Sequence, residues 1–300
     1  MIEGTLSYFI REVATILNDP TVSASADGTI MEDRTTRFLN VAQRRLAHKL
    51  RDMHVRAALF ARKVTLTVNT VDEYAYNLPP RFIGVAMVED SDGIVYRYVP
   101  SRLRYHEQGY VLEYRQSTTG SMTVPVVRFI NMFPASSATV YAWVIEEPAR
   151  MSEGDADWGA TDVTFDATPT LAGILIDQDD YYNGAEVACI TSDTAAAVGQ
   201  IRQISDYVAA TRVATVAAWT TEPADNDDYS IISGLPRVLW PCIVYDAAAA
   251  IALVDSRWDK DDRASIRKER DLSFNRAMEV LNSMAAGANI GARQEYAVVH

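Results

Sequence analysis

The sequence predicts an α+β protein in which both chain ends form an up-and-down helical bundle, with an antiparallel β-region and an inserted small β-barrel or sandwich module between them. Three observations lead to this fold class. Apolar residues recur with a helical period near the start and near the end of the chain. Between them the period changes to two. The later part of this β-region is strongly acidic and is separately punctuated by turn residues.

Two helices are predicted in the first part of the chain. Residues 5–18, TLSYFIREVATILN, place six large apolar side chains at helical spacing, and Pro20 then stops the helix. Residues 32–60 give the longest helical signal of this half, and their apolar stripe consists of Leu39, Ala42, Leu46, Leu50 and Met53. The second helix also has a basic side, because four arginines lie mostly off that stripe: Arg37, Arg44, Arg45 and Arg51.

Residues 63–148 read as an antiparallel β-region. KVTLTV alternates and is rich in β-branched residues, and NLPPRF is an extended turn because its two prolines forbid helix. Five further short strand patterns follow: GVAMVED, GIVYRYV, GYVLEYR, VPVVRFINMF and ATVYAWVIEE. Since Gly, Pro and Ser punctuate them, we expect an antiparallel sheet or small sandwich with tyrosines along one face.

Residues 149–234 form a separate acidic β-module. Residues 146–233 contain seventeen Asp and Glu residues against only Arg150, Arg202 and Arg212. The strand patterns within the module are short and two-sided, so a small barrel or sandwich is expected. Its ends are polar and its charge is distinct, which predicts an excursion that the rest of the chain does not need in order to fold.

Helical periodicity returns after Ser233-Gly234. Helices are predicted over residues 236–256, where Pro236 lies near the first turn, and over residues 259–285, which begin with acidic residues. Both chain ends carry apolar stripes of this kind. Residues 1–62 and 235–286 are therefore expected to share one bundle, with both β-modules as excursions from it.

The last segment, residues 287–300, is expected to be a flexible tail. Gly287 and Gly291 end regular structure, yet Tyr296, Val298 and Val299 are strand formers. A terminus with this pattern suits β-augmentation, in which an extended peptide adds to the edge of a partner's sheet. The alternative is a frayed end whose apolar residues have no role.

No catalytic or cofactor motif is present, so we expect neither an enzyme nor a bound cofactor. The chain has no P-loop, no dinucleotide-binding glycine pattern, no nucleophile elbow and no zinc-protease motif. Its histidines are spaced for structural or surface roles: His48, His54, His106 and His300. DQDDYYNG and ADNDDY resemble fragments of calcium loops without their spacing, so solvated turns and a weak Ca²⁺ site both remain open. Cys189 and Cys242 are expected to be free, buried thiols in a reducing compartment.

The charge distribution indicates where macromolecular partners would bind. The chain has a net charge of −12, whereas residues 32–63 carry nine Arg and Lys against three acidic residues. Arg37, Arg44, Arg45 and Arg51 are therefore candidate contacts for DNA or for an acidic neighbour, against the simpler reading of a solvated helix face. The chain has no run of eighteen apolar residues, so no membrane span is expected.

Several stretches together resemble the head-to-tail adaptor (connector or head-completion) proteins of tailed bacteriophages. The likeness is carried by FLNVAQRRLA, LPPRF and YDAAAAIAL, taken in this order along the chain. The acidic module, with its GQIRQISDY and later AAWTTEP, is similar to a β-module that recurs in phage virion proteins.

The resemblance implies a structural virion protein at the head–tail interface, assembled in the host cytoplasm. It would form a homo-oligomeric ring, twelvefold by resemblance, that joins the portal protein to tail or nozzle proteins and lines a channel through which DNA passes. The resemblance also implies that the C-terminal tail, with Tyr296, Val298 and Val299, docks in the portal. The alternative is a tail or baseplate component whose acidic β-module binds a receptor or glycan. An adaptor should close into a ring, whereas a receptor binder should favour trimers and bind cells alone.

Overall fold

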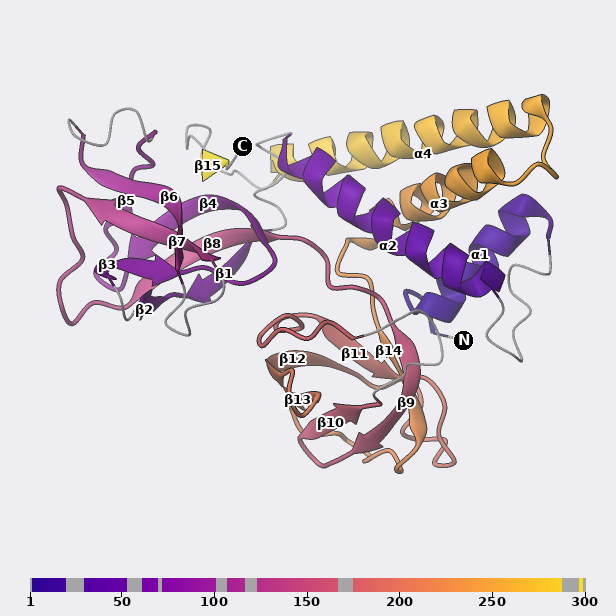
Figure 1. The fold of residues 1–300 in the computed structure, drawn as a ribbon, viewed down its shortest axis with the longest axis horizontal. Coiled ribbons are helices and arrows are strands. Elements are labelled where there is room, and N and C mark those ends of the chain that lie inside the picture. The colour runs from indigo at the N-terminus through magenta and orange to yellow at the C-terminus, as the bar shows by residue number, and fades with distance from the viewer. Residues whose placement is uncertain are drawn as a thin grey trace. The chain divides into compact units, whose positions relative to one another are not determined.

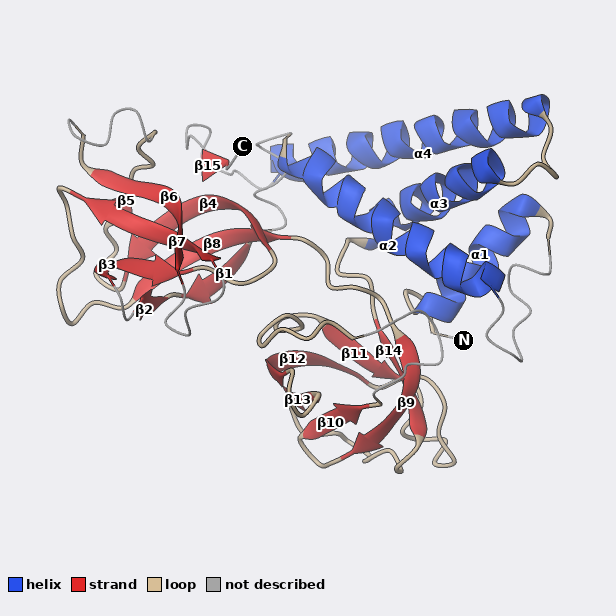
Figure 2. Ribbon diagram, viewed as in Figure 1, coloured by secondary structure: helices blue, strands red, loops and turns tan. Residues whose placement is uncertain are grey.

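The protein is a mixture of helices and antiparallel sheets, as the computed structural model shows (Figures 1 and 2). The structure describes residues 2–19, 30–52, 61–69, 72–100, 107–116, 123–166, 175–287 and 297–298. The chain divides into two compact units. The first comprises Met1–Leu46 with Pro148–Val280, and the second comprises Ala47–Glu147 with Leu281–His300.

The helices lie where the periodicity predicts them. Among the described residues these are α1 (Leu6–Leu17), α2 (Ile30–Arg51), α3 (Trp240–Val254) and α4 (Lys260–Gly287), with a 3₁₀ turn at Arg237–Leu239 before α3. Residues 53–60 of the second predicted helix lie outside the described part of the chain. Pro236, which was expected in the first turn of the third helix, precedes the 3₁₀ turn. Pro241 instead occupies the first turn of α3, where a missing N–H costs no helical hydrogen bond.

Local capping sets the helix ends. The Thr5 hydroxyl accepts a hydrogen bond from the Tyr8 N–H at the start of α1, and Asn18 ends the helix in the left-handed conformation with φ 48°. At the start of α4, one carboxylate oxygen of Asp259 accepts from the N–H groups of Asp261 and Asp262, at 2.8 and 2.9 Å. These polar caps satisfy N–H groups that have no partner within the helix.

Helices α1 and α3 pack closely in the first unit. The Phe9 and Trp240 rings meet edge to face with centroids 5.6 Å apart, and Leu6, Phe9 and Ile243 are buried. The stretch Arg237–Val254 is long and apolar enough to cross a membrane, with a mean hydropathy of 1.6. Its contacts with α1 instead place it as an internal helix of the folded unit.

The predicted up-and-down bundle of both chain ends is not evident among the described helices. Particular side chains link these helices: Arg45 of α2 and Arg270 of α4 both reach Asp246 of α3, and Arg257 pairs with Asp19 after α1. The departure from the prediction has a physical reason. The N-terminus of α1 and the buried Gln43 of α2 find their polar partners in or beside the acidic β-module, not in other helices.

The second unit contains two antiparallel sheets around one core. The first sheet has the order β1 (Arg62–Thr65), β8 (Val140–Glu146), β4 (Phe82–Asp90) and β15 (Ala297–Val298), and β5 (Val95–Tyr96) also pairs with β4. The second has the order β2 (Thr67–Asn69), β3 (Asp72–Asn77), β7 (Thr123–Ile130) and β6 (Gly109–Gln116). Val85, Val144, Val127 and Phe129 belong to the same buried cluster, which makes this region a sandwich.

The acidic β-module is a closed barrel, as the short strand patterns predict. Its antiparallel strands run in the order β10 (Asp162–Phe165), β13 (Val213–Val216), β12 (Ile201–Val208), β11 (Glu186–Cys189), β14 (Asp227–Ile231) and β9 (Glu153–Trp158). Aromatic rings fill its interior, with Phe165, Tyr182, Tyr207 and Tyr229 all fully buried. Closure removes the exposed strand edges that would otherwise promote aggregation.

Buried hydrogen bonds join the barrel to α1 and α2. The Leu6 and Ser7 N–H groups donate to Ser230 Oγ and Glu153 Oε2, at 3.2 and 3.0 Å. Gln43, which is 1% exposed, donates to the Ala149 carbonyl at 2.9 Å and accepts from the Ser233 hydroxyl at 3.1 Å. These bonds tie α1 and α2 to residues 149–234, and whether the rest of the chain folds without them stays a prediction.

Candidate functional site

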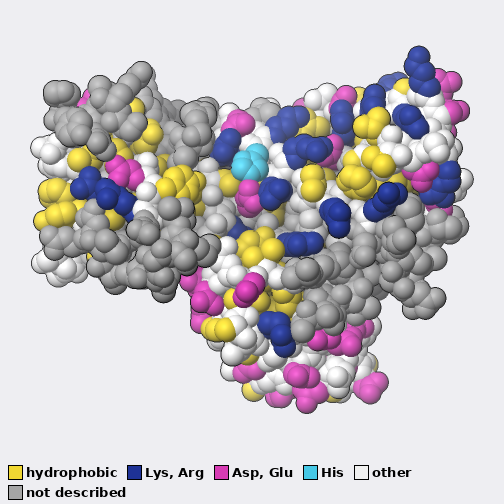
Figure 3. Space-filling model, in the orientation of Figure 1, with side chains coloured by type: hydrophobic (Ala, Val, Ile, Leu, Met, Phe, Trp, Pro, Cys, Tyr) yellow, Lys and Arg dark blue, Asp and Glu magenta, His cyan; other side chains and the backbone are white. Residues whose placement is uncertain are grey.

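Helix α2 carries a row of exposed arginines along one side. We call Arg34, Arg37, Arg44 and Arg45 the basic face of α2; all four are exposed, while Leu39, Ala42 and Leu46 on the other side are buried. Arg37, Val41 and Arg44 recur at the spacing that places side chains on one helix face. Figure 3 shows Lys and Arg side chains over the helical part of the chain and Asp and Glu side chains over the barrel.

The arginines of α2 differ in their partners. Arg45 pairs with Asp246 at 2.9 Å, and Arg51, which sequence reasoning grouped with this face, pairs with Asp52 at 2.7 Å. Arg37 and Arg44 make no hydrogen bond or ion pair with another described residue. Both guanidinium groups can pair with an anionic partner.

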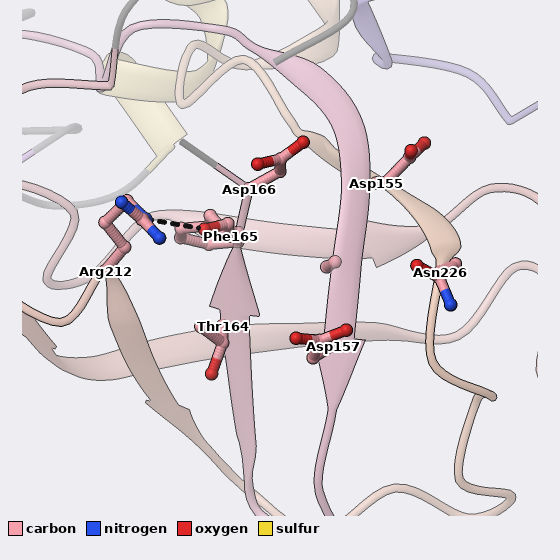
Figure 4. Close-up of a pocket in the computed structure, with 8 residues that line it drawn as sticks. Asp155, Asp157, Thr164, Phe165, Asp166, Arg212 and Asn226 are labelled. Carbon is pink, nitrogen blue, oxygen red and sulfur yellow. Dashed lines mark hydrogen bonds between the residues drawn. The ribbon is translucent and has the colours of Figure 1, made fainter. Parts of the chain in front are cut away.

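Carboxylates gather on the outer wall of the barrel. We call Asp155, Asp157, Asp166 and Asp228 the carboxylate face: the first two lie on β9, Asp166 follows β10, and Asp228 lies on β14 directly opposite Asp155. Asp155, Asp157 and Asp166 line a hollow of about 240 Å³ with Thr164, Arg212 and Asn226 (Figure 4). The Arg212 Nε–H donates to the Phe165 carbonyl at 3.0 Å and not to a carboxylate.

The carboxylate face is electrostatically strained. The hydrogen-bonding carboxylate of Asp228, together with burial and the negative charges of Asp228 and Asp166, raises the pKa of Asp155. Like charges directly opposite one another on paired strands destabilise a sheet. A face of this kind is suited to binding a cationic group, because a positive charge would relieve the repulsion.

We expect Asp155→Asn to stabilise the barrel at neutral pH by about 0.5 kcal/mol or less, because it removes one of the two opposed charges. The raised pKa means that the folded protein holds this proton more tightly than the unfolded chain, so the penalty is fully present above the folded pKa. It fades as the pH falls toward the ordinary value of 3.8.

Thermal unfolding at pH 7 and pH 4 checks this expectation. Asp157→Asn is the matched control, since Asp157 is exposed on the same strand and lies opposite Thr164. The melting temperature should rise for Asp155→Asn at pH 7 and should differ less from that of the native chain at pH 4. Equal effects of the two substitutions at both pH values would contradict the opposed-charge explanation.

The acid-rich turns hold no evident metal site. Asp180 and Asn226 have left-handed backbones, with φ 63° and 68°, and the Asn183 amide donates to the Asp180 carboxylate at 2.7 Å. No group of three or more His, Cys, Asp or Glu side chains that could hold a metal ion occurs in the described ranges. DQDDYYNG ends in a turn, and ADNDDY turns at Asp225 and Asn226 before β14 begins at Asp227.

The C-terminal tail contributes a strand to its own chain. Ala297–Val298 forms β15 and pairs antiparallel with β4, with Ala297 opposite Val85 and Val298 opposite Gly84. Tyr296 and Val299, the other predicted docking residues, lie outside the described residues. The strand tendency of the tail therefore appears here as pairing with a sheet of the same chain.

The described histidine and the two cysteines are held in the fold by hydrogen bonding or burial. His48 Nε2 lies within hydrogen-bond distance of Glu147 Oε1, and His54, His106 and His300 are outside the described residues. Cys189 and Cys242 are both buried. Burial, with the charges of Asp227 and Asp228, raises the pKa of the Cys189 thiol to about 12, so little nucleophilic thiolate forms at neutral pH.

Sequence reasoning did not single out the carboxylate face. One signal was present: Asp155 and Asp157 alternate along EGDADW, so they point to the same side of a strand. Asp228 could not be added from the sequence, because its position depends on the register between β14 and β9. That register is set by the closed barrel.

A known family accounts for most of the chain. The sequence model of the SU10 adaptor protein family matches residues 5–213, which include α1, α2, both sheets of the second unit except β15, and most of the barrel. No curated protein and no solved structure matched the chain. The chain belongs to the SU10 adaptor protein family.

Proposed function

We propose that this member of the SU10 adaptor family is a virion protein that forms a ring between the portal of a phage capsid and the tail. The observation that carries the proposal is the family match over residues 5–213, which indicates a structural adaptor of a phage. The ring would be a homo-oligomer of twelvefold symmetry, assembled in the host cytoplasm. Tail or nozzle proteins would bind beyond it, and DNA would pass through its channel.

The described residues support a structural role in place of a catalytic one. The described residues that line the hollow on the barrel are carboxylates, Ala156, Phe165, Thr164, Arg212 and Asn226, and His48 is not among them. The basic face of α2 and the carboxylate face each gather charges of one sign, which suits macromolecular partners. The arginines of α2 are candidate contacts for DNA or for a neighbouring subunit.

The C-terminal tail is proposed as the portal-docking segment. Among the described residues, Ala297 and Val298 of the tail pair with β4. Docking by Tyr296, Val298 and Val299 would replace this pairing with a strand added to the portal's own sheet edge.

Deleting residues 288–300 should abolish portal binding while the fold persists. The deletion leaves α4 complete, because that helix ends at Gly287, and among the described residues it removes Ala297 and Val298 from the first sheet. Binding would be measured by co-sedimentation with portal rings of the same virus, and folding by thermal unfolding. A tail of the same composition in scrambled order is the control for length.

Two outcomes would contradict the proposal. If the truncated chain binds portal rings as tightly as the full chain, the tail is not the docking segment. If the full chain does not bind portal rings, and antibody labelling of virions places it away from the head–tail interface in electron micrographs, the adaptor role itself is wrong.

A further inference from the structure

Two oppositely charged surfaces lie on the same compact unit. The basic face of α2 and the carboxylate face of the barrel both fall within Met1–Leu46 and Pro148–Val280. Arg37 and Arg44 have no partner among the described residues, and Asp155 and Asp228 oppose one another across two strands. Within one chain Arg37 and Arg44 therefore do not pair with Asp155 or Asp228.

A ring of identical subunits needs two different, complementary surfaces on each subunit. Heterologous contacts join one surface of a copy to another surface of the next copy, and they close into a ring when the rotation allows. Opposite charges set the register of such contacts and raise the association rate. This chain supplies an oppositely charged pair of surfaces on one unit.

We propose that the basic face of α2 of one copy docks on the carboxylate face of the barrel of the next copy. The proposal rests on the ring proposed above and names its subunit interface. Arg37 and Arg44 would lie against Asp155, Asp157 and Asp166, where a guanidinium group can bind a carboxylate with two parallel hydrogen bonds. The hollow of about 240 Å³ lined by those carboxylates offers room for such a side chain.

The observations favour a second copy over DNA as the partner of this face. A complementary acidic surface is present on the same chain, and residues 146–233 carry seventeen acidic residues against three arginines. That excess charge would repel a phosphate backbone near the barrel. It would attract the basic face of a neighbouring copy.

A paired charge reversal tests the contact. The variant Arg37→Glu/Arg44→Glu replaces two arginines of the basic face with carboxylates, and the variant Asp155→Lys/Asp166→Lys replaces two of the four carboxylates with ammonium groups. Each variant therefore places like charges against one another at the proposed contact. Each alone should associate at least about tenfold more weakly than the native chain. An equimolar mixture should recover association when copies of the two variants alternate. The introduced carboxylates of one variant then face the introduced ammonium groups of the other, and the remaining contacts keep the native charges.

Sedimentation velocity at low salt measures self-association over a range of concentrations, and co-sedimentation measures assembly on portal rings. All four substituted residues are exposed, so thermal unfolding should change little. Arg267→Glu/Arg276→Glu is the matched control, because it reverses two exposed arginines on α4 of the same unit. This control should associate like the native chain.

Several results would overturn the proposal. The first is native association in both reversed variants, or no recovery in their mixture. The second is a native chain that stays monomeric both alone and with portal rings. The third is a loss of binding to a 30-base-pair DNA duplex in Arg37→Glu/Arg44→Glu with self-association intact, which would make DNA the partner. If the native chain assembles on portals while the reversals have no effect, the adaptor role stands and only this interface is wrong.

Discussion

Replacing residues 149–234 with a short Gly/Ser linker is expected to abolish cooperative unfolding of the helical part of the chain. The deletion removes hydrogen-bond partners of four polar groups at once. The Leu6 and Ser7 N–H groups lose Ser230 and Glu153. The Gln43 amide loses Ala149 and Ser233 and keeps the Asn40 side chain. Each hydrogen bond contributes about 0.5–1.5 kcal/mol net, so the loss of four is a large fraction of the roughly 5–15 kcal/mol that stabilises a domain.

A shorter deletion separates these hydrogen bonds from the bulk of the barrel. Replacing only residues 154–229 keeps Ala149, Glu153, Ser230 and Ser233, together with the Ser230–Glu153 strand pairing. Circular dichroism on heating should show a broad or absent transition for the longer deletion and a steeper one for the shorter. A native-like melt of the longer deletion would show that the helices fold independently of the barrel, as their periodicity alone suggested.

The sequence was sufficient for the elements and insufficient for the contacts between them. Helical periodicity located α1, α2, α3 and α4, and alternation with turn residues located the acidic barrel, because burial of one side of each element imposes those periods. Gln43 shows the limit. In the sequence it is one more polar residue near the arginines of α2. In the structure it is buried and hydrogen-bonds to the Ala149 carbonyl and the Ser233 hydroxyl, which are far away in the sequence.

Of the two charged faces, one could be predicted from local sequence and the other could not. The basic face of α2 follows from the spacing of Arg37 and Arg44 on one helix, so local sequence was enough to propose it. The carboxylate face depends on pairing between β9 and β14, which are distant in the chain. The tail was expected to add to a partner's sheet, and its pairing with β4 depends on which edge lies within its reach.

The barrel interior should be the most sensitive part of the module to loss of volume. Phe165 is fully buried, and its ring centroid lies 4.5 Å from that of Tyr229 and 6.1 Å from those of Tyr182 and Tyr207. Phe165→Ala would leave a cavity among rings that a closed ladder of strands holds in place. We expect the free energy of unfolding to fall by about 3–5 kcal/mol.

Urea denaturation followed by tryptophan fluorescence measures this loss, because Trp158 and Trp219 pack against each other in the same core, with centroids 5.1 Å apart. Phe133→Ala is the matched control, since Phe133 is 49% exposed and stacks on Tyr74. The control should cost about 1 kcal/mol or less, because little apolar area returns to water. Comparable losses in the free energy of unfolding in the two variants would mean that the barrel relaxes around the missing ring. The strands that bear the carboxylate face would then be deformable and not rigid.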